Sequence, residues 1–207
     1  MNGIHASKQK KIQRKFFLAA MDISRSDAAG VLLANEEKIG GPGVLMIRDC
    51  EQRGFHKLAA KPHFILDRKL GLRVRDVEFY GPVWLVSGRA KSCFEAADKQ
   101  AFDFCACDIE NRNEPKDTDY WLCDVVRIID AIDASGPNIK KEYDGVGRLF
   151  YPLAFSHKIT IKEDVESNYH VFRPQHMEMD VFVDNEVISL CRKNKISGLK
   201  FYDLLKL

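Results

Sequence analysis

The sequence has no apolar run near the length that a membrane span needs. Such a span takes at least about 18 consecutive apolar residues, whereas the most apolar stretch near the start, Phe16 to Met21, is ended by Asp22. The basic residues before it imitate a signal peptide, but the stretch is shorter than the usual apolar region of about 7 to 15 residues and no small-residue cleavage site follows. We therefore expect no membrane association and predict a strand at Phe16 to Met21.

Motifs for catalysis and cofactor binding are also missing. The sequence holds no serine-hydrolase elbow, no dinucleotide fingerprint and no kinase signature. The stretch Gly40-Gly41-Pro42-Gly43 lacks the Lys-Ser/Thr pair of a phosphate-binding loop, so we predict an ordinary loop there. No residue offers a starting point for an enzymatic mechanism, and we expect no catalytic residue and no cofactor.

Metal-binding and disulfide patterns are absent although six cysteines are present. There is no Cys-x-x-Cys and no His-x-x-x-His, and a structural zinc site usually needs two closely spaced ligand pairs. Cys105 and Cys107 are the one close pair. A Cys123 nucleophile is disfavoured because neighbouring Asp124 would raise the thiol pKa. We expect no metal, and free thiols in a reducing compartment, at all six positions: Cys50, Cys93, Cys105, Cys107, Cys123 and Cys191.

What the chain does have is an ordinary globular composition. With 207 residues, 45% hydrophobic and 30% charged, it is long enough to bury a core without disulfides or metals. We predict an α+β fold: a single compact domain with a mostly antiparallel sheet and a few helices. Its expected middle elements are a buried strand at Val83 to Val86, a helix capped by Ser87 and running through Phe94 and Ala97, and a strand at Phe102 to Ile109.

The C-terminal region predicts a strand, a helix and a second strand. Alternation from Met177 to Val183 indicates a strand with one face drier than the other. Asp184 is a suitable N-cap, and Gly198 supplies a left-handed stop. The helix between them is expected to bury Val187, Ile188, Leu190 and Cys191, and a short strand at Leu199 to Tyr202 is expected to close the domain.

Charge is distributed unevenly beneath a net charge of +2. Residues 1–15 contain no acid and five bases, which are Lys8, Lys10, Lys11, Arg14 and Lys15. We predict that residues 1–15 are a flexible basic segment and that residues 16–207 form the domain. Residues 103–133 hold nine acids and three bases, a net charge of −6, and this segment is expected to offer a negative surface to a basic partner.

Three carboxylates lie near Arg127 in the sequence, and a catalytic acid/base group would need them on one face. Neither a helix nor a strand brings Asp124, Asp130 and Asp133 to one face. We therefore predict a structural ion pair of Arg127 with Asp124 or Asp130. The apolar pattern of Tyr120 to Asp133 suits both a helix and a strand, and we favour a strand that continues into a helical turn or bend.

The string Tyr120-Trp-Leu-Cys-Asp-Val-Val-Arg-Ile-Ile-Asp-Ala-Ile-Asp133 is long and specific. Together with Pro62-His-Phe-Ile-Leu-Asp67, Trp84-Leu-Val-Ser87, His170-Val-Phe-Arg173 and Ile196-Ser-Gly-Leu-Lys-Phe201, it resembles the eleventh family of immunity proteins of bacterial polymorphic toxin systems. The resemblance covers most of the chain from about Lys61 onward and implies a cytoplasmic antitoxin that binds a secreted toxin. It implies no catalytic residue. We expect Trp121 and Cys123 to be largely buried, and a structural role for all the signature residues: Trp121, Cys123, Asp124, Arg127, Asp130, Asp133, His170, Phe172 and Arg173.

The resemblance and the charge pattern together predict stoichiometric binding of a cognate toxin in interbacterial competition. The expected contact is the acidic stretch, through Asp108, Glu110, Glu114, Asp117 and Asp119. Two alternatives stay open. One is an enzyme that reverses or blocks a modification made by the toxin. The other is a nucleic-acid-binding protein that uses Lys8 to Lys15 and Arg68 to Arg75, against which the small net charge argues.

Overall fold

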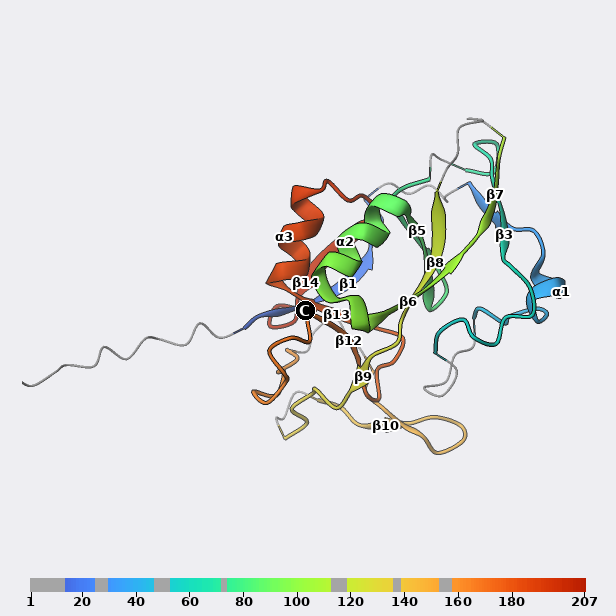
Figure 1. Ribbon diagram of the computed structural model, residues 1–207. Coiled ribbons are helices and arrows are strands. Elements are labelled where there is room, and N and C mark those ends of the chain that lie inside the picture. Colours follow the sequence, from blue (N-terminus) through green and yellow to red (C-terminus); the bar gives the residue numbers. More distant parts are fainter. Residues whose placement is uncertain are drawn as a thin grey trace, which may run out of the picture.

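A computed structural model describes residues 14–24, 30–46, 53–71, 74–112, 119–135, 139–152 and 158–207, and the structural statements below concern these residues. Strands in four sheets make up most of the regular structure (Figure 1). The described part also contains three α-helices: α1 (Glu36–Ile39), α2 (Gly88–Asp98) and α3 (Asn185–Lys193). A short 3₁₀ turn, Lys99–Ala101, follows α2.

The larger of the two main sheets has five strands in the order β14-β1-β13-β12-β9. The bounds are β1 (Phe16–Met21), β9 (Ile128–Ile129), β12 (Val171–Pro174), β13 (Val181–Asp184) and β14 (Leu199–Asp203). All neighbours are antiparallel except β12 and β9. Leu18 of β1 lies opposite Phe182 on one side and Tyr202 on the other. The strand predicted at Phe16 to Met21 is therefore confirmed, and it pairs with the C-terminal strands.

The second main sheet has four antiparallel strands in the order β4-β5-β8-β6. The bounds are β4 (Val77–Tyr80), β5 (Val83–Ser87), β6 (Phe102–Ala106) and β8 (Tyr120–Val125). The Ser87 hydroxyl accepts a hydrogen bond of 3.2 Å from the Ala90 amide and so caps α2. The predicted buried strand and the predicted helix cap are both confirmed.

The strand predicted at Phe102 to Ile109 divides at Cys107. Its first half, β6, pairs with β8, whereas its second half, β7 (Asp108–Asn111), pairs in parallel with β3 (His63–Leu66). β3 also pairs with β2 (Val31–Leu33), which completes a three-stranded sheet. A separate hairpin of β10 (Glu142–Tyr143) and β11 (Leu149–Phe150) lies at the lower edge of Figure 1.

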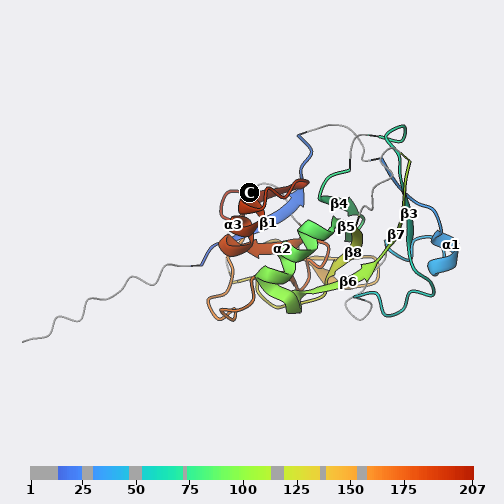
Figure 2. The same cartoon turned by 45° about the horizontal axis from the view of Figure 1, so that its top comes forward.

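The two faces of each main sheet pack into different apolar clusters of the core. Figure 1 and Figure 2 show α2 and α3 side by side, and Phe94 and Val187 of these helices share one apolar cluster with Trp84 of β5 and Val183 of β13. On the reverse of the four-stranded sheet, Leu85 and Leu122 pack with the three-stranded sheet. On the reverse of the five-stranded sheet, the apolar cluster is formed by Phe16, Leu18, Ala131, Ile132, Ile159, Phe172, Met177, Phe182 and Leu204. Because both main sheets share the cluster under the helices, they form the predicted single α+β domain.

The strand predicted from Met177 to Val183 is shorter than expected. Met177 to Asp180 form a turn, closed by a 2.9 Å hydrogen bond from the Asp180 amide to the Met177 carbonyl, and the strand begins at Val181. The expected drier face is wrong too, because β13 lies between β1 and β12 and all four of its residues are buried. Apolar alternation alone does not separate a strand from the turn before it.

The helix predicted after Asp184 is confirmed, but the expected role of Gly198 is wrong. The Asp184 carboxylate accepts from the Glu186 and Val187 amides, and α3 buries Val187, Ile188 and Cys191, with Leu190 half-buried. The left-handed residue after the helix is Lys195, with φ of 52°. Gly198 instead lies against β4, where a Cβ atom would come within 2.0 Å of the Val77 carbonyl oxygen.

The segment from Tyr120 to Asp133 is mostly strand. After β8 it forms β9, and Ile132 bridges to Ile161 in an antiparallel arrangement. The strand part of the expectation is confirmed. Of the two endings expected, the helical turn is not found, but the chain does bend after β9, where the Ala131 amide donates a 3.0 Å hydrogen bond to the Ile129 carbonyl. The antiparallel bridge to Ile161 favours an extended backbone at Ile132, and this distant partner is not visible in the local sequence pattern.

Candidate functional site

Two of the five acids predicted to contact a partner lie on β7. Asp108 and Glu110 alternate with Ile109, which packs against the core behind the four-stranded sheet, so both carboxylates face outward. Their side chains are 60% and 46% exposed. We refer to the outward side of β7, carrying Asp108 and Glu110, as the β7 face.

Each carboxylate of the β7 face already has a basic neighbour. Lys61 forms an ion pair with Asp108, and this hydrogen bond raises the pKa of Lys61. The Arg112 Nε atom donates to Glu110 at 2.8 Å, and the Nε2 atom of His63 lies 4.0 Å from the same carboxylate. The β7 face is therefore a surface of alternating charge and not a purely negative one.

The other acids expected at this contact are placed differently. The Asp119 carboxylate accepts a 2.7 Å hydrogen bond from the indole Nε1 of Trp121, and its backbone carbonyl accepts from the Gly88 amide. Asp119 is thus engaged where β8 begins, beside the start of α2. Glu114 and Asp117 lie outside the described residues.

A buried charged cluster links the two main sheets. Asp124 of β8 is fully buried, and its carboxylate lies 3.1 Å from an Arg53 nitrogen and 3.3 Å from an Arg173 nitrogen. Its second oxygen accepts a 3.0 Å hydrogen bond from the Gly54 amide. We call Arg53, Asp124 and Arg173 the junction cluster, because Arg173 belongs to β12 of the five-stranded sheet and Asp124 to the four-stranded sheet.

Arg173 is satisfied mainly by backbone carbonyls. Its guanidinium donates to Val125 at 2.9 Å and to Glu178 at 2.8 Å, and also to Pro82. Burial, together with the nearby Arg53 charge, lowers the pKa of Arg173 to about 10, so the side chain stays cationic at neutral pH. Because all of these contacts lie inside the fold, the role of Arg173 is to connect the five-stranded sheet to the four-stranded sheet.

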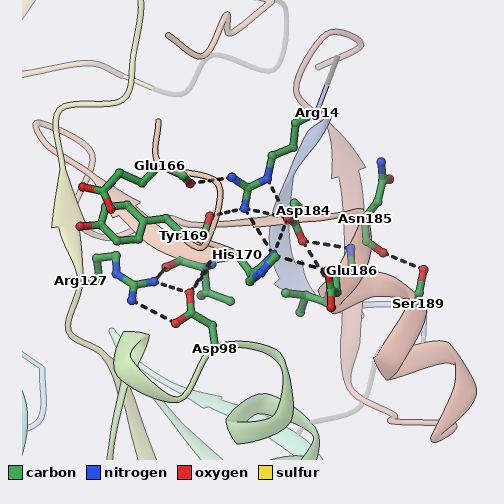
Figure 3. A network of polar contacts seen from close by, with 12 residues as sticks. Arg14, Asp98, Arg127, Glu166, Tyr169, His170, Asp184, Asn185, Glu186 and Ser189 are labelled. Atoms are coloured by element: carbon green, nitrogen blue, oxygen red, sulfur yellow. Dashed lines mark hydrogen bonds and ion pairs between the residues drawn. The ribbon is translucent and has the colours of Figure 1, made fainter. Parts of the chain in front are cut away.

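A second polar network connects the ends of several elements (Figure 3). Asp98, at the end of α2, forms an ion pair with Arg127 that includes a 3.0 Å contact, and it accepts a 2.9 Å hydrogen bond from the His170 amide. The Arg127 guanidinium lies 4.3 Å from the centre of the Tyr169 ring. The prediction that Arg127 pairs with Asp124 or Asp130 is wrong. Asp124 belongs to the junction cluster, and Asp130 pairs with Lys162 at 2.6 Å.

The other half of this network is centred on Asp184. Its carboxylate lies 2.8 Å from the Nδ1 atom of His170 and accepts a 2.9 Å hydrogen bond from Arg14, while also capping α3. Arg14 additionally donates to the Glu166 and Tyr169 carbonyls. His170 is therefore held at Nδ1 by a carboxylate that has other structural partners.

The start of the described chain is tied to this network. Besides the Arg14 contacts, Lys15 pairs with Asp203 at 2.6 Å. Both residues belong to the segment expected to be flexible, and residues 1–13 lie outside the described residues. The boundary after residue 15 stays a prediction.

The comparison with known families decides what kind of protein carries these features. The sequence matches the Immunity protein family (Imm11) over residues 15–206. This chain belongs to the Imm11 immunity protein family. A search of curated proteins found no match. The family resemblance read from the sequence is confirmed, and the match reaches further towards the N-terminus than the quoted motifs.

The remaining signature residues of this Imm11 protein pack inside the fold or bond locally. Cys123 is 1% exposed, and Phe172 is fully buried against the rings of Phe16 and Phe182. Trp121 is half-buried, so the expectation that it would be largely buried is wrong, and the Lys91 ammonium lies 4.7 Å from its ring. Asp133 accepts a 2.6 Å hydrogen bond from the Ser135 hydroxyl.

The cysteines in the described part of the Imm11 chain form neither a disulfide nor a metal site. The five cysteines there are free thiols, and Cys50 lies outside it. Burial raises the pKa of Cys107 to about 12, and burial and the Asp124 charge raise that of Cys123. These ranges contain no group of three or more His, Cys, Asp or Glu side chains placed to hold a metal ion. No helix found in them has the length and apolarity to cross a membrane.

Sequence reasoning missed three residues that matter to these networks. Arg53 and Asp98 were not singled out, and Asp184 was recognised as a helix cap but not as a partner of His170 and Arg14. Arg53 and Asp98 contact partners far along the chain, and neither stands in a local motif. Among the basic residues Arg68 to Arg75, considered above for nucleic-acid binding, Arg75 is already neutralised by a two-point ion pair with Glu78.

Proposed function

We propose that this protein neutralises a toxin by binding it in a stoichiometric complex in the cytoplasm. The observation that carries the proposal is the immunity-family match across nearly the whole chain. The chemistry of the described residues supports a binding role. The buried carboxylates of the junction cluster and of the Asp98 network are engaged by arginines that join elements of the fold.

The acidic stretch is proposed as part of the contact, through Asp108, Glu110, Glu114, Asp117 and Asp119. The exposure of the two carboxylates on the β7 face supports this. Their present ion pairs with Lys61 and Arg112 are exposed, and such pairs contribute about 0 to 1 kcal/mol. A cationic toxin surface therefore replaces these local partners at little cost in free energy, and it also attracts the carboxylates at long range.

A charge-reversal experiment tests the location of the contact. Asp108→Lys combined with Glu110→Lys should slow association with the toxin, identified as the product of the neighbouring gene, more than it speeds dissociation. The matched control combines Glu163→Lys with Asp164→Lys, which changes the net charge equally at exposed acids outside β7 and outside the acidic stretch. Equal association rates for the two double variants would show that only net charge matters and would remove the β7 face from the interface.

A titration of toxin activity tests the stoichiometric mechanism separately. Toxin activity should fall linearly with added immunity protein and end near one molecule of immunity protein for each molecule of toxin. Full inhibition at a small fraction of the toxin concentration would instead require turnover. That outcome would replace the binding mechanism with an enzymatic one, whatever the β7 variants show.

A further inference from the structure

Two cysteines from neighbouring helices place their sulfur atoms in contact. Cys93 of α2 and Cys191 of α3 lie 98 positions apart in the sequence, yet their Sγ atoms are 4.0 Å apart. The two helices run side by side in Figure 1 and Figure 2. Since a disulfide has a sulfur–sulfur distance of about 2.05 Å, the sulfurs need to approach by about 2 Å to bond.

The surroundings of Cys93 favour its reactive form. The pKa of Cys93 is lowered, because the hydrogen-bonding contact with the Cys191 thiol and the Asn194 side-chain amide, 3.9 Å from the Cys93 sulfur, favour its thiolate more than burial opposes it. By contrast, the pKa values of Cys107 and Cys123 are raised. Thiolate is the nucleophilic form of cysteine, so Cys93 is the sulfur expected to react first.

The pair is shielded from large reagents but lies close to the surface. Cys93 and Cys191 are 4% and 3% exposed, whereas Asn194, whose amide contacts the Cys93 sulfur, is an exposed residue just after α3. A small oxidant such as a peroxide needs only a local opening at this helix end to reach Cys93. The burial selects against bulky disulfide oxidants.

We propose that Cys93 and Cys191 are a peroxide-sensitive dithiol that forms a disulfide between α2 and α3. In the first step the Cys93 thiolate attacks one peroxide oxygen. The sulfur–oxygen bond forms, the oxygen–oxygen bond breaks, and hydroxide leaves and takes up a proton to become water. In the second step the Cys191 sulfur attacks the Cys93 sulfenic acid, and the hydroxyl leaves with the Cys191 proton as water. The two sulfurs lose two electrons in total, and these reduce hydrogen peroxide to two molecules of water.

Peptide mapping of the full chain after treatment with hydrogen peroxide tests the proposal. The peptides that contain Cys93 and Cys191 should appear joined, the protein should be two hydrogen atoms lighter, and dithiothreitol should reverse both changes. The oxidised protein should also have a higher Tm, because the cross-link restricts the unfolded chain. Recovery of both cysteines as free thiols, or of Cys93 joined to a different cysteine, would overturn the proposal.

Single substitutions establish the order of the two steps. Cys191→Ser should stop the reaction at a Cys93 sulfenic acid that dimedone traps, whereas Cys93→Ser should leave Cys191 unmodified. Cys105→Ser is the matched control and should form the cross-link as the parent does. Dimedone labelling at Cys191 in the Cys93→Ser variant would contradict the assignment of Cys93 as the attacking sulfur. None of these readouts depends on toxin binding.

Discussion

The junction cluster and the β7 face contain the same kinds of charged group but use them differently. Asp124 is fully buried between Arg53 and Arg173, whereas Asp108 and Glu110 pair with Lys61 and Arg112 in water. Removing one partner of a buried ion pair leaves an uncompensated charge and costs about 3 to 5 kcal/mol. An exposed pair contributes about 0 to 1 kcal/mol. The comparison shows that burial decides whether a carboxylate stabilises this fold or stays available to a partner.

The largest effect is expected at the junction cluster. Asp124→Ala should lower the free energy of unfolding by about 3 to 5 kcal/mol, because Arg53 and Arg173 would stay buried without their carboxylate. Urea unfolding followed by circular dichroism measures the change. Asp130→Ala is the control, since Asp130 pairs with Lys162 at the surface. Equal losses in the two variants would abolish the distinction between buried and exposed pairs.

A smaller effect is expected at Asp98, in the network of Figure 3. Asp98→Ala should cost about 2 to 3 kcal/mol, because it removes the partner of Arg127 and the acceptor for the His170 amide. Arg127 retains its contact with the Val171 carbonyl and is less completely buried than Arg173, which reduces the loss. Thermal unfolding beside Asp124→Ala gives the ranking, and a larger loss at Asp98 would reverse it.

A pH-dependent effect is expected at Asp180, next to the junction cluster. Burial raises the pKa of Asp180 to about 6, against 3.8 ordinarily, even though Arg173 opposes the shift. Because the pKa of Asp180 is higher in the folded than in the unfolded state, the folded state holds the proton more tightly. The stability that Asp180 contributes is therefore fully present below about pH 4 and is lost as the pH rises through 6. At about 1.4 kcal/mol per unit, reduced for partial exposure, the change amounts to about 2 kcal/mol.

Asp180→Asn should remove this dependence. Denaturant unfolding between pH 4 and pH 8 should give a flatter stability profile for the variant than for the parent, with a gain for the variant at pH 8. Parallel profiles for the two proteins would mean that Asp180 is ionised throughout this range. Asp203→Asn is a useful control, because the hydrogen bond from Lys15 lowers the pKa of Asp203.

The smallest effect on stability is expected at the β7 face. Asp108→Lys combined with Glu110→Lys should change the free energy of unfolding by no more than about 1 kcal/mol, because the side chains are exposed and their pairs are screened by salt. Thermal unfolding at low and high salt measures this. A loss as large as that of Asp124→Ala would mean that Asp108 and Glu110 are needed for folding. The association rates of the double variant would then reflect misfolding and not a lost contact with the toxin.

Sequence reasoning succeeded where the deciding interactions are local. Ser87 and Asp184 cap their helices through residues two or three positions away, and a continuous apolar run identified β5 as a buried strand. It failed for the partner of Arg127, because Asp98 lies 29 positions away at the end of α2, where it also accepts hydrogen bonds from the distant His170 and Val171 amides. Local pattern therefore gave the fold class and several elements correctly, while tertiary packing determined the ion pairs.

The candidate site shows the same limit. Summing charge along residues 103–133 counts Asp124 equally with Asp108, although the first is inside the protein and the second is in water. The Asp103 carboxylate is likewise engaged within the fold, because it accepts a 2.8 Å hydrogen bond from the Phe55 amide. The surface of this segment is thus less negative than the −6 of the linear sum, and solvent exposure is what a sequence count omits.

The position of β1 between β13 and β14 has a consequence for how the protein comes into being. β1 is the first described strand to be synthesised, yet both of its hydrogen-bonding neighbours are among the last. A nascent chain therefore carries Phe16 to Met21 without strand partners until almost all of it has left the ribosome. Pairing over such a sequence separation slows folding and exposes apolar segments to aggregation in the meantime. The five-stranded sheet is therefore complete only after the C-terminal strands have emerged, and until then the apolar side chains of β1 depend on chaperones for shielding from aggregation.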